Sequence, residues 1–433
     1  MKSFYKYLIP SVISSIFISA FVLIDGIFIG TKLKDIGLAA INIAWPITAL
    51  IQAFGIAIGM SGGIYITRLN ALKETEKASK IKALTLLIIT VTAIVLGLIL
   101  YLLRYPLLTI FGASGETLSL AVKYLNVILI GAIFQMLGCG IMPLIKNSGK
   151  IKVAFIASVS SILVNLFLDY LFVFRFDWQL EGAALASMIG QASAMTICFI
   201  SYKEELNSIS LNKKDIKEIL ICSFAPFILN YSYSFIIIIT NALCMNYGKE
   251  ALVAAYTLLS YLLYIISAAA QGVGDAIQPL FTSSYEKKEI STFKMLNKCN
   301  LISIIILLSI TFLFVIFKRN LSLLYNLSAE ADRLYNIGLV PYFIGFIFIS
   351  VSKVSCSFMY SINKKGLANF LTLLEPLIIT PIIYLIMCPL FEINGIFYGF
   401  LIIQIILFAI SIILTYQIRR KTINEWNNCS RQA

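Results

Sequence analysis

Apolar runs of about 20 residues or more recur along the whole chain, and each is long enough to cross a bilayer as a helix. They lack the alternation typical of lipid-facing strands, which excludes a β-barrel. Of the 433 residues, 60% are hydrophobic and only 13% are charged. The sequence therefore predicts an all-α integral membrane protein with twelve transmembrane helices. The twelve runs are 7–31, 37–66, 83–104, 118–145, 152–174, 181–202, 217–246, 251–284, 299–317, 333–362, 366–390 and 393–418.

The positions of the basic residues predict the orientation of these helices. With both termini on the cytoplasmic side, 24 of the 34 Lys and Arg residues fall in inner segments and nine in outer loops, and Lys353 lies inside a helix. This excess follows the positive-inside rule. The net charge of +13 is therefore a topology signal, and we expect no nucleic-acid partner. We expect a multi-pass protein of the plasma membrane with cytoplasmic termini.

An internal repeat divides the chain into two halves. The stretch that starts at Ile9 aligns with the one that starts at Ala225, so that Asp25 matches Asn241 at an offset of 216 residues. Later matches fall at offsets of 215 and 214. Because each half has six crossings, the repeat is parallel, and transporters use such pairs of bundles. We predict two pseudo-symmetric six-helix bundles at 1–202 and 217–418, joined by a cytoplasmic linker at 203–216 and followed by a cytoplasmic tail at 419–433.

Three polar side chains of the first half are predicted to share one depth in the membrane. Asp25, Asp169 and Ser187 each lie six or seven residues from the charged residue that marks the outer end of their helix. At 1.5 Å per residue, all three sit about 9–10 Å below that end. Asn165 precedes Asp169 by four residues and so lies on the same helix face. We expect these four residues to form a site.

Such a site has two possible occupants. Carboxylate, amide and hydroxyl oxygens could hold a hard cation, here Na⁺ at Asp25, Asn165 and Asp169. The carboxyl groups could equally hold a proton, because burial and a neighbouring negative charge both favour the neutral form. A purely structural role, in which Asp25 and Asp169 cross-link helices near the interface, is the alternative. An intramembrane carboxylate is nevertheless a functional-site hypothesis by default.

A second layer of charge lies in the other half. Asp275, Lys353 and Glu375 are ten or eleven residues from the predicted cytoplasmic ends of their helices, which places them about 15–17 Å from those ends. An unpaired lysine at that depth is unfavourable, so we expect Lys353 to pair with Glu375 or Asp275. The remaining carboxylate is then a candidate contact for a cationic substrate. A structural ion pair beside a water-filled cavity is an equally good interpretation.

Tyrosines crowd the runs 217–246 and 251–284. An aromatic wall can hold a lipophilic cation by cation–π contact, so Tyr231, Tyr256 and Tyr261 are candidate substrate contacts. Tyrosines also populate the membrane interface, which is the alternative interpretation. The chain has no histidine, so any proton handling falls to carboxylates. We predict no catalytic residues, hence no enzyme, and no cofactor apart from the coupling ion.

Four stretches resemble one known family. They are "VLIDGIFIGTKLKDIGLAAINIAWPI", "KNSGKIKVAFIASVSSILVNLFLDYLFVF", "LEGAALASMIGQ" and "GVGDAIQPLFTSSYEKKE". They are similar to the corresponding stretches of the MATE family of multidrug and toxic compound extruders, of the MOP-type fold, and lean toward its DinF-like and MepA-like branches. The similarity extends over all twelve predicted helices.

The resemblance implies a role for the residues that depth had grouped. In those branches an aspartate of the first helix, an Asn-x-x-x-Asp pair of the fifth and a hydroxyl of the sixth form the cation or proton site. This carries over to Asp25, Asn165, Asp169 and Ser187. Family members that couple through the second half carry an acid where this chain has Asn241, which favours coupling in the first half.

The resemblance and the residues together predict a secondary active antiporter. It exports amphipathic, cationic drugs or toxic compounds in exchange for Na⁺ or H⁺ by alternating access, and acts as a monomer in the lipid bilayer. A flippase for lipid-linked saccharide precursors, from the same superfamily, is the alternative, but it would need more basic residues at membrane depth than Lys353. A membrane transferase would need a catalytic histidine or an aspartate-rich motif, and the sequence has neither.

Overall fold

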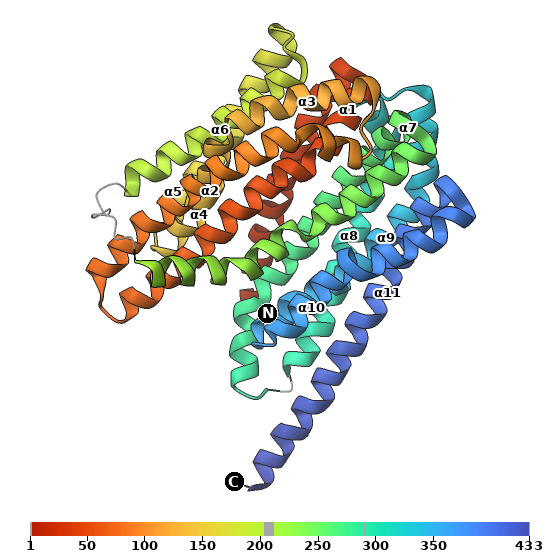
Figure 1. The fold of residues 1–433 in the computed structure, drawn as a ribbon. Coiled ribbons are helices and arrows are strands. Elements are labelled where there is room, and N and C mark those ends of the chain that lie inside the picture. The colour runs from red at the N-terminus through yellow and green to blue at the C-terminus, as the bar shows by residue number, and fades with distance from the viewer. Residues whose placement is uncertain (1, 203–211, 290, 433) are drawn as a thin grey trace. The chain divides into compact units, whose positions relative to one another are not determined.

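The computed structural model describes residues 2–202, 212–289 and 291–432, and it is built of helices (Figure 1). Their backbone hydrogen bonds are satisfied within each segment, as a bilayer requires. The elements are α1 (Lys2–Ala71), α2 (Thr75–Ile110), α3 (Gly115–Ile130), α4 (Ala132–Asn147), α5 (Ile151–Asp169), the π-helix η1 (Tyr170–Arg175), α6 (Gln179–Tyr202), α7 (Lys213–Glu286), α8 (Ser291–Leu324), α9 (Ala329–Ser361), α10 (Lys365–Leu374), the π-helix η3 (Glu375–Ile379) and α11 (Thr380–Gln432).

The described helices are long and apolar enough to span a membrane repeatedly. Eight candidate spans are present, or nine when α3 and α4, which meet at a 62° bend, count as one. Three spans run for 48, 66 and 62 residues, two to three times the roughly 20 residues that one crossing needs. Each contains one non-helical residue, at Lys34, Lys249 or Glu392. The fold is therefore all-helical and multi-span, with up to nine candidate spans in the described residues and a break inside the three longest.

Residues in the left-handed backbone region recur at the spacing of the sequence repeat. Lysine, aspartate and glutamate are unfavourable there by roughly 1–2 kcal/mol, so each such residue marks a turn that its surroundings impose. Ten of these residues form five pairs across the two halves, whereas Gly115 and Gln179 match no other described residue with positive φ. The pairs are Lys34 with Lys249, Lys73 with Lys288 and Asp177 with Glu392 at an offset of 215, and Gly112 with Asn326 and Gly149 with Asn363 at 214.

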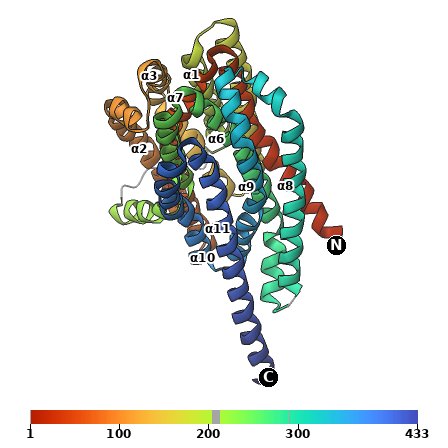
Figure 2. The ribbon, with the colours of Figure 1, turned by 90° about the vertical axis from the view of Figure 1, so that its right-hand side faces the viewer.

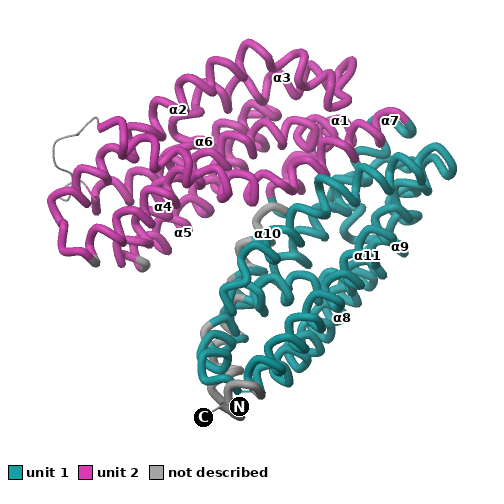
Figure 3. Tube along the Cα trace, turned by 60° about the horizontal axis from the view of Figure 1, so that its bottom comes forward, with its two compact units in different colours: residues 1–24, 247–433 teal, residues 25–246 magenta. Residues whose placement is uncertain are grey.

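The chain forms two compact units, and the long helices α1 and α7 each contribute residues to both (Figure 3). Unit 1 comprises residues 1–24 and 247–433, and unit 2 comprises residues 25–246. Helix α1 therefore passes from one unit to the other between Ile24 and Asp25, and α7 does so after Asn246. The compact units thus differ from the repeated halves, whose predicted linker is described only from residue 212 onward. Asp25 is the first residue of unit 2, which also contains α5 and α6.

The core of unit 1 includes the beginning of α1. Leu8 and Val12 are buried among residues of α7, α8 and α9. Ser11 Oγ donates to the carbonyl of Gly272 at 2.9 Å. Phe358 of α9 lies edge-on to Phe281 of α7, with ring centroids 5.1 Å apart. Helices α8 and α9 pack side by side (Figure 2). The first turns of the chain thus belong to the packing of the second repeat.

Unit 2 depends on close backbone contact between α1 and α4. A Cβ on Gly59 would lie 2.0 Å from the carbonyl oxygen of Gly140, and a Cβ on Gly55 would lie 2.5 Å from that of Met136. Only glycine permits this approach, because a neighbouring backbone atom cannot move aside as a flexible side chain does. Helix α4 in turn packs against α6.

We predict that Gly59→Ala destabilises the protein by about 1–3 kcal/mol, because the new methyl group forces α1 away from α4. Thermal unfolding of the detergent-solubilised protein, followed by loss of the monodisperse chromatographic peak, measures the effect. Gly366→Ala is the matched control, since a Cβ there meets nothing within 4 Å. Equal melting temperatures for the two variants would contradict the close contact.

Candidate functional site

Two carboxyl groups meet inside unit 2. Asp25 of α1 and Asp169 at the end of α5 lie within hydrogen-bond reach of each other. Asp169 is completely buried and Asp25 partly so. Asp25 Oδ1 and both carboxyl oxygens of Asp169 are buried without a hydrogen-bond donor in the described residues. Two ionised carboxylates cannot donate to each other, so this contact requires a shared proton or a bound cation.

Asn165 and Ser187 lie beside Asp169, as the sequence predicted. Asn165 is on α5 one turn before Asp169 and is 4% exposed, and its Nδ2 donates to Ser187 Oγ of α6 at 3.4 Å. The approach of the two helices depends on Gly190, whose Cβ would lie 3.0 Å from Asn165 Cβ. The structure therefore brings all four predicted residues of the first half together.

A π-helical segment begins directly after Asp169. Residues Tyr170–Arg175 form η1, and Phe176 N donates to the carbonyl of Leu171 at 3.0 Å, five residues back. Such segments insert into α-helices mostly as single turns and are frequent at functional sites. The altered register rotates the outer end of this helix relative to α5. Asp169 is thus the last residue whose side chain keeps the direction set by the regular α5 helix.

Tyr124 and Thr48 complete the surroundings of the carboxyl pair, and sequence reasoning missed both. Tyr124 of α3 is 4% exposed, lies beside Thr48 of α1 and is within electrostatic reach of both Asp25 and Asp169. Thr48 is 2% exposed, and its Oγ1 has no partner in the described part of the chain. A tyrosine or threonine inside an apolar run is ordinary, so neither residue carried a signal that would have found it.

The cluster consists of oxygen atoms and has no basic partner. Among the described residues no lysine or arginine forms an ion pair with Asp25 or Asp169. No group of three or more His, Cys, Asp and Glu side chains that could together hold a metal ion occurs in the described chain either. Two carboxyl groups with an amide and hydroxyls form a small, hard donor set. The arrangement can hold one or two protons, or a monovalent cation.

The charges of the second half are arranged differently from the expected ion pair. Glu375, the first residue of η3, accepts a 2.7 Å hydrogen bond from Gln404 Nε2 of α11. No ion pair joins it to Lys353 in the described structure, so of the two expected partners of that lysine Asp275 remains. The side chain of Asp275 lies outside the described residues. Gly274 and Lys353 belong to facing helices, α7 and α9, since a Cβ on Gly274 would lie 3.7 Å from Lys353 O.

The three candidate tyrosines are divided between the two units. Tyr231 lies in unit 2, 9% exposed, with its ring stacked on Phe227 at a centroid distance of 5.7 Å. Tyr256 and Tyr261 lie in unit 1. Tyr256 is 2% exposed, so its ring is buried. Tyr261 lies 6.1 Å from the ring of Tyr325.

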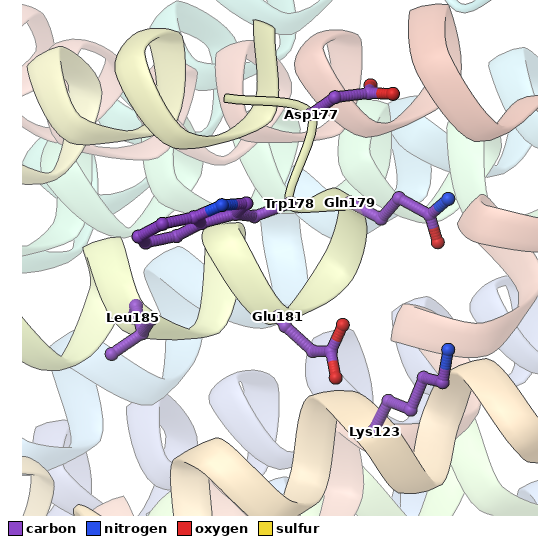
Figure 4. A pocket seen from close by; sticks show the side chains of 6 residues that line it. All are labelled: Lys123, Asp177, Trp178, Gln179, Glu181 and Leu185. Atoms are coloured by element: carbon purple, nitrogen blue, oxygen red, sulfur yellow. The ribbon is translucent and has the colours of Figure 1, made fainter. Parts of the chain in front are cut away.

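A hollow of about 460 Å³ opens beside the turn before α6, away from the predicted residues (Figure 4). Lys123 of α3 and Glu181 of α6 extend into the same space. Asp177, on the rim, pairs with Lys32 at 3.1 Å. Positive and negative side chains are mixed, and none of the carboxyl-pair residues lines it. The lining residues are Lys123, Asp177, Trp178, Gln179, Glu181 and Leu185.

Comparison with known proteins shows similarity to one family. The MatE family model matches residues 10–171. The "Multidrug export protein MepA" of Staphylococcus saprophyticus is 23% identical, covering 98% of this chain and 95% of its own length. MepA of Staphylococcus aureus strain NCTC 8325 is 24% identical, and the match covers 96% of this chain and 94% of the length of MepA.

Solved structures share the fold over nearly the whole chain. An inward-facing multidrug resistance MATE family transporter of the MOP superfamily superposes with a TM-score of 0.82 at 17% identity, covering 94% of this chain and 96% of that one. The MATE multidrug transporter DinF-BH, solved as a complex with a ligand, gives a TM-score of 0.73 at 24% identity, covering 96% of each chain. The family model over residues 10–171, the relatives along nearly the whole chain and the shared helical fold all show similarity to the MATE family, whose members are membrane transporters and not enzymes.

Proposed function

We propose that the protein is a multidrug exporter that uses an inward gradient of H⁺ or Na⁺ to expel amphipathic, cationic small molecules. The observation that carries this proposal is the pair of buried carboxyl groups, Asp25 and Asp169, which has no basic partner in the described residues. A site that must take up a positive charge to be stable is suited to couple ion binding to a change of state. The similar proteins of Staphylococcus are named multidrug export proteins, which agrees with the proposed substrate class.

The coupling follows from where the two carboxyl groups are attached. Asp25 is on α1, at the point where that helix passes from unit 1 to unit 2, and Asp169 is anchored in unit 2. Without a bound charge, two carboxylates repel each other in a medium of low dielectric constant. A proton or cation between them turns this repulsion into attraction and draws α1 toward α5. Ion binding therefore favours one arrangement of α1 over another.

Exchange requires that ion and substrate prefer different states. A ligand shifts a conformational equilibrium only by its difference in affinity between the two states. In the proposed cycle, ion binding from outside favours the state with low substrate affinity, and release of the ion inside restores the substrate-binding state. Asp275, Lys353, Glu375, Tyr231, Tyr256 and Tyr261 remain candidate substrate contacts. We place the protein in the plasma membrane as a monomer with both termini in the cytoplasm.

Replacing Asp25 or Asp169 with Asn removes the charge that the ion must neutralise while keeping nearly the same shape. We predict that efflux of a cationic dye from proteoliposomes under an ion gradient falls to background for both variants, with unchanged melting temperature. Asp177→Asn is the matched control, because that carboxylate is exposed and pairs with Lys32. Normal gradient-driven efflux by Asp25→Asn would refute the proposed coupling.

Imposed gradients distinguish the two ions. Dye efflux is measured first under an inward Na⁺ gradient at equal pH on both sides, then under a pH gradient without Na⁺. We expect one gradient to drive efflux and the Asp25→Asn variant to lose that response. If neither gradient moves any of a broad panel of dyes, export is contradicted, and translocation of lipid-linked saccharides is the next activity to assay.

Removing the Tyr124 hydroxyl tests the wider cluster. The group lies beside Thr48 and within reach of both carboxyl groups, so Tyr124→Phe weakens the oxygen cluster and leaves its charges in place. We predict a several-fold fall in coupled efflux, between wild type and Asp25→Asn. Phe substitution at Tyr101, which is 36% exposed on α2, is the control. Loss equal to that of Asp25→Asn would instead make Tyr124 indispensable.

A further inference from the structure

The proposed function leaves one physical problem, and the inference below rests on that function. Asp25 and Asp169 are predicted to lie about 9–10 Å below the outer ends of their helices. An ion that enters from outside must still reach the cytoplasm, most of the membrane thickness away. Bare hydrocarbon is a barrier to any charge, so the ion needs polar groups along its way out.

A row of polar side chains leads inward from the carboxyl pair along α5. Asp169, Asn165, Ser161 and Ser158 are separated by four, four and three residues, which places them on one face of the helix. From Asp169 to Ser158 the rise is about 16 Å. This face meets α6, because a Cβ on Gly190 would lie 2.9 Å from Ser161 O. The row therefore lies along the contact between two helices, with Asn165 and Asp169 buried and Ser158 and Ser161 half-buried.

Helix α6 continues the row with groups of its own. Ser193 Oγ donates to the Gly190 carbonyl at 2.7 Å and lies 3.4 Å from Ser160 Oγ of α5. Gln191 Oε1 lies 3.7 Å from Cys139 Sγ of α4. A Cβ on Gly138 would lie only 2.7 Å from that same amide oxygen. Gln191 therefore lies at a close contact between α4 and α6.

A buried amide oxygen with no hydrogen-bond donor among the described residues lies on the same face of α4. Gln135 is 2% exposed, and its Oε1 accepts no hydrogen bond from the described residues. It is four residues after Gly131 and three before Gly138, and built Cβ atoms at both glycines meet α6, at Met188 and Gln191. Helical spacing thus directs Gln135 toward α6. An unsatisfied buried acceptor is unfavourable unless a water or cation visits it.

The polar row is interrupted at Met142. The Met142 Sδ atom of α4 lies 3.9 Å from Ser158 Oγ and 4.0 Å from Cys198 Sγ, and a thioether is only a weak acceptor. Beyond it, hydroxyl groups resume where Ser148 Oγ and Tyr202 OH lie 3.1 Å apart at the ends of α4 and α6. Met142 thus lies at the inner end of the row, next to Ser158.

We propose that the interior of the α4–α5–α6 bundle is the route by which the coupling ion leaves the carboxyl pair for the cytoplasm. Ser161, Ser193, Gln135 and Gln191 provide oxygen atoms along it for H⁺, carried on water, or for Na⁺. Met142 is its gate, because an apolar constriction blocks hydrated charge until it moves aside. The route lies wholly within unit 2, so it does not depend on contact with unit 1.

Two variants with opposite effects test the route. Met142→Ser replaces the apolar gate with a hydroxyl, and we expect substrate-independent ion leak into proteoliposomes to rise about tenfold, a barrier lowered by roughly 1.4 kcal/mol. Gln191→Leu removes a polar group, and we expect gradient-driven efflux to fall about tenfold while the dye Kd is unchanged. Ion flux is read with a pH-sensitive dye for H⁺ and with ²²Na⁺ for Na⁺.

The controls separate this inference from the proposed function. Thr196→Val alters a hydroxyl that is exposed and bonded to its own helix at Ala192 O, so it leaves both fluxes unchanged. If Gln191→Leu does not fold, Ser161→Ala takes its place. Wild-type protein that shows no gradient-driven efflux contradicts the proposed function. Coupled wild-type efflux with no leak in Met142→Ser and normal rates in Gln191→Leu overturns the route alone.

Discussion

The contact between Asp25 and Asp169 is the constraint on which the rest of the structure depends. Two carboxyl groups brought together in a poorly solvated interior cannot both remain charged without a counter-ion, because attraction to water no longer offsets their repulsion. The described residues supply no lysine or arginine for the purpose. The compensating positive charge must therefore come from solution. The close contact of the two carboxyl groups is stable only with a bound proton or cation.

The architecture holds this unfavourable pair in place by packing around it. Gly190 lets α6 lie directly against α5 at Asn165, and η1 changes the helical register immediately after Asp169. The close contact of Gly59 with Gly140 fixes α1 to α4, which packs on α6. Each contact is made by a small residue or a backbone change, so the helices approach closely without large side chains between them. Asp25 thereby reaches Asp169 from a different helix.

The two halves share a backbone plan and differ in chemistry. Left-handed turns recur at nearly constant spacing, yet the position that matches Asp25 is Asn241. Asn241 is completely buried, accepts from Asn42 Nδ2 at 3.1 Å and donates to the Asn42 carbonyl at 3.0 Å. Its hydrogen bonds are thus satisfied within the protein, so this position has no need of an ion. The same backbone plan thus carries a carboxyl pair that needs a proton or cation in one half and a fully hydrogen-bonded asparagine in the other.

The sequence by itself determined the all-helical, multi-span membrane class, and it predicted twelve crossings and a layer shared by Asp25, Asn165, Asp169 and Ser187. Hydrophobic length, charge distribution and helical rise are local properties, and they can be read along one chain. Only the tertiary structure decided that the carboxyl groups touch, that Tyr124 and Thr48 stand beside them, and that Glu375 pairs with Gln404 and not with Lys353. It also decided that α1 changes units at Asp25. These outcomes depend on which helix faces meet. The helical period of 3.6 residues predicts which side chains share a face, but it does not predict which other helix packs against that face.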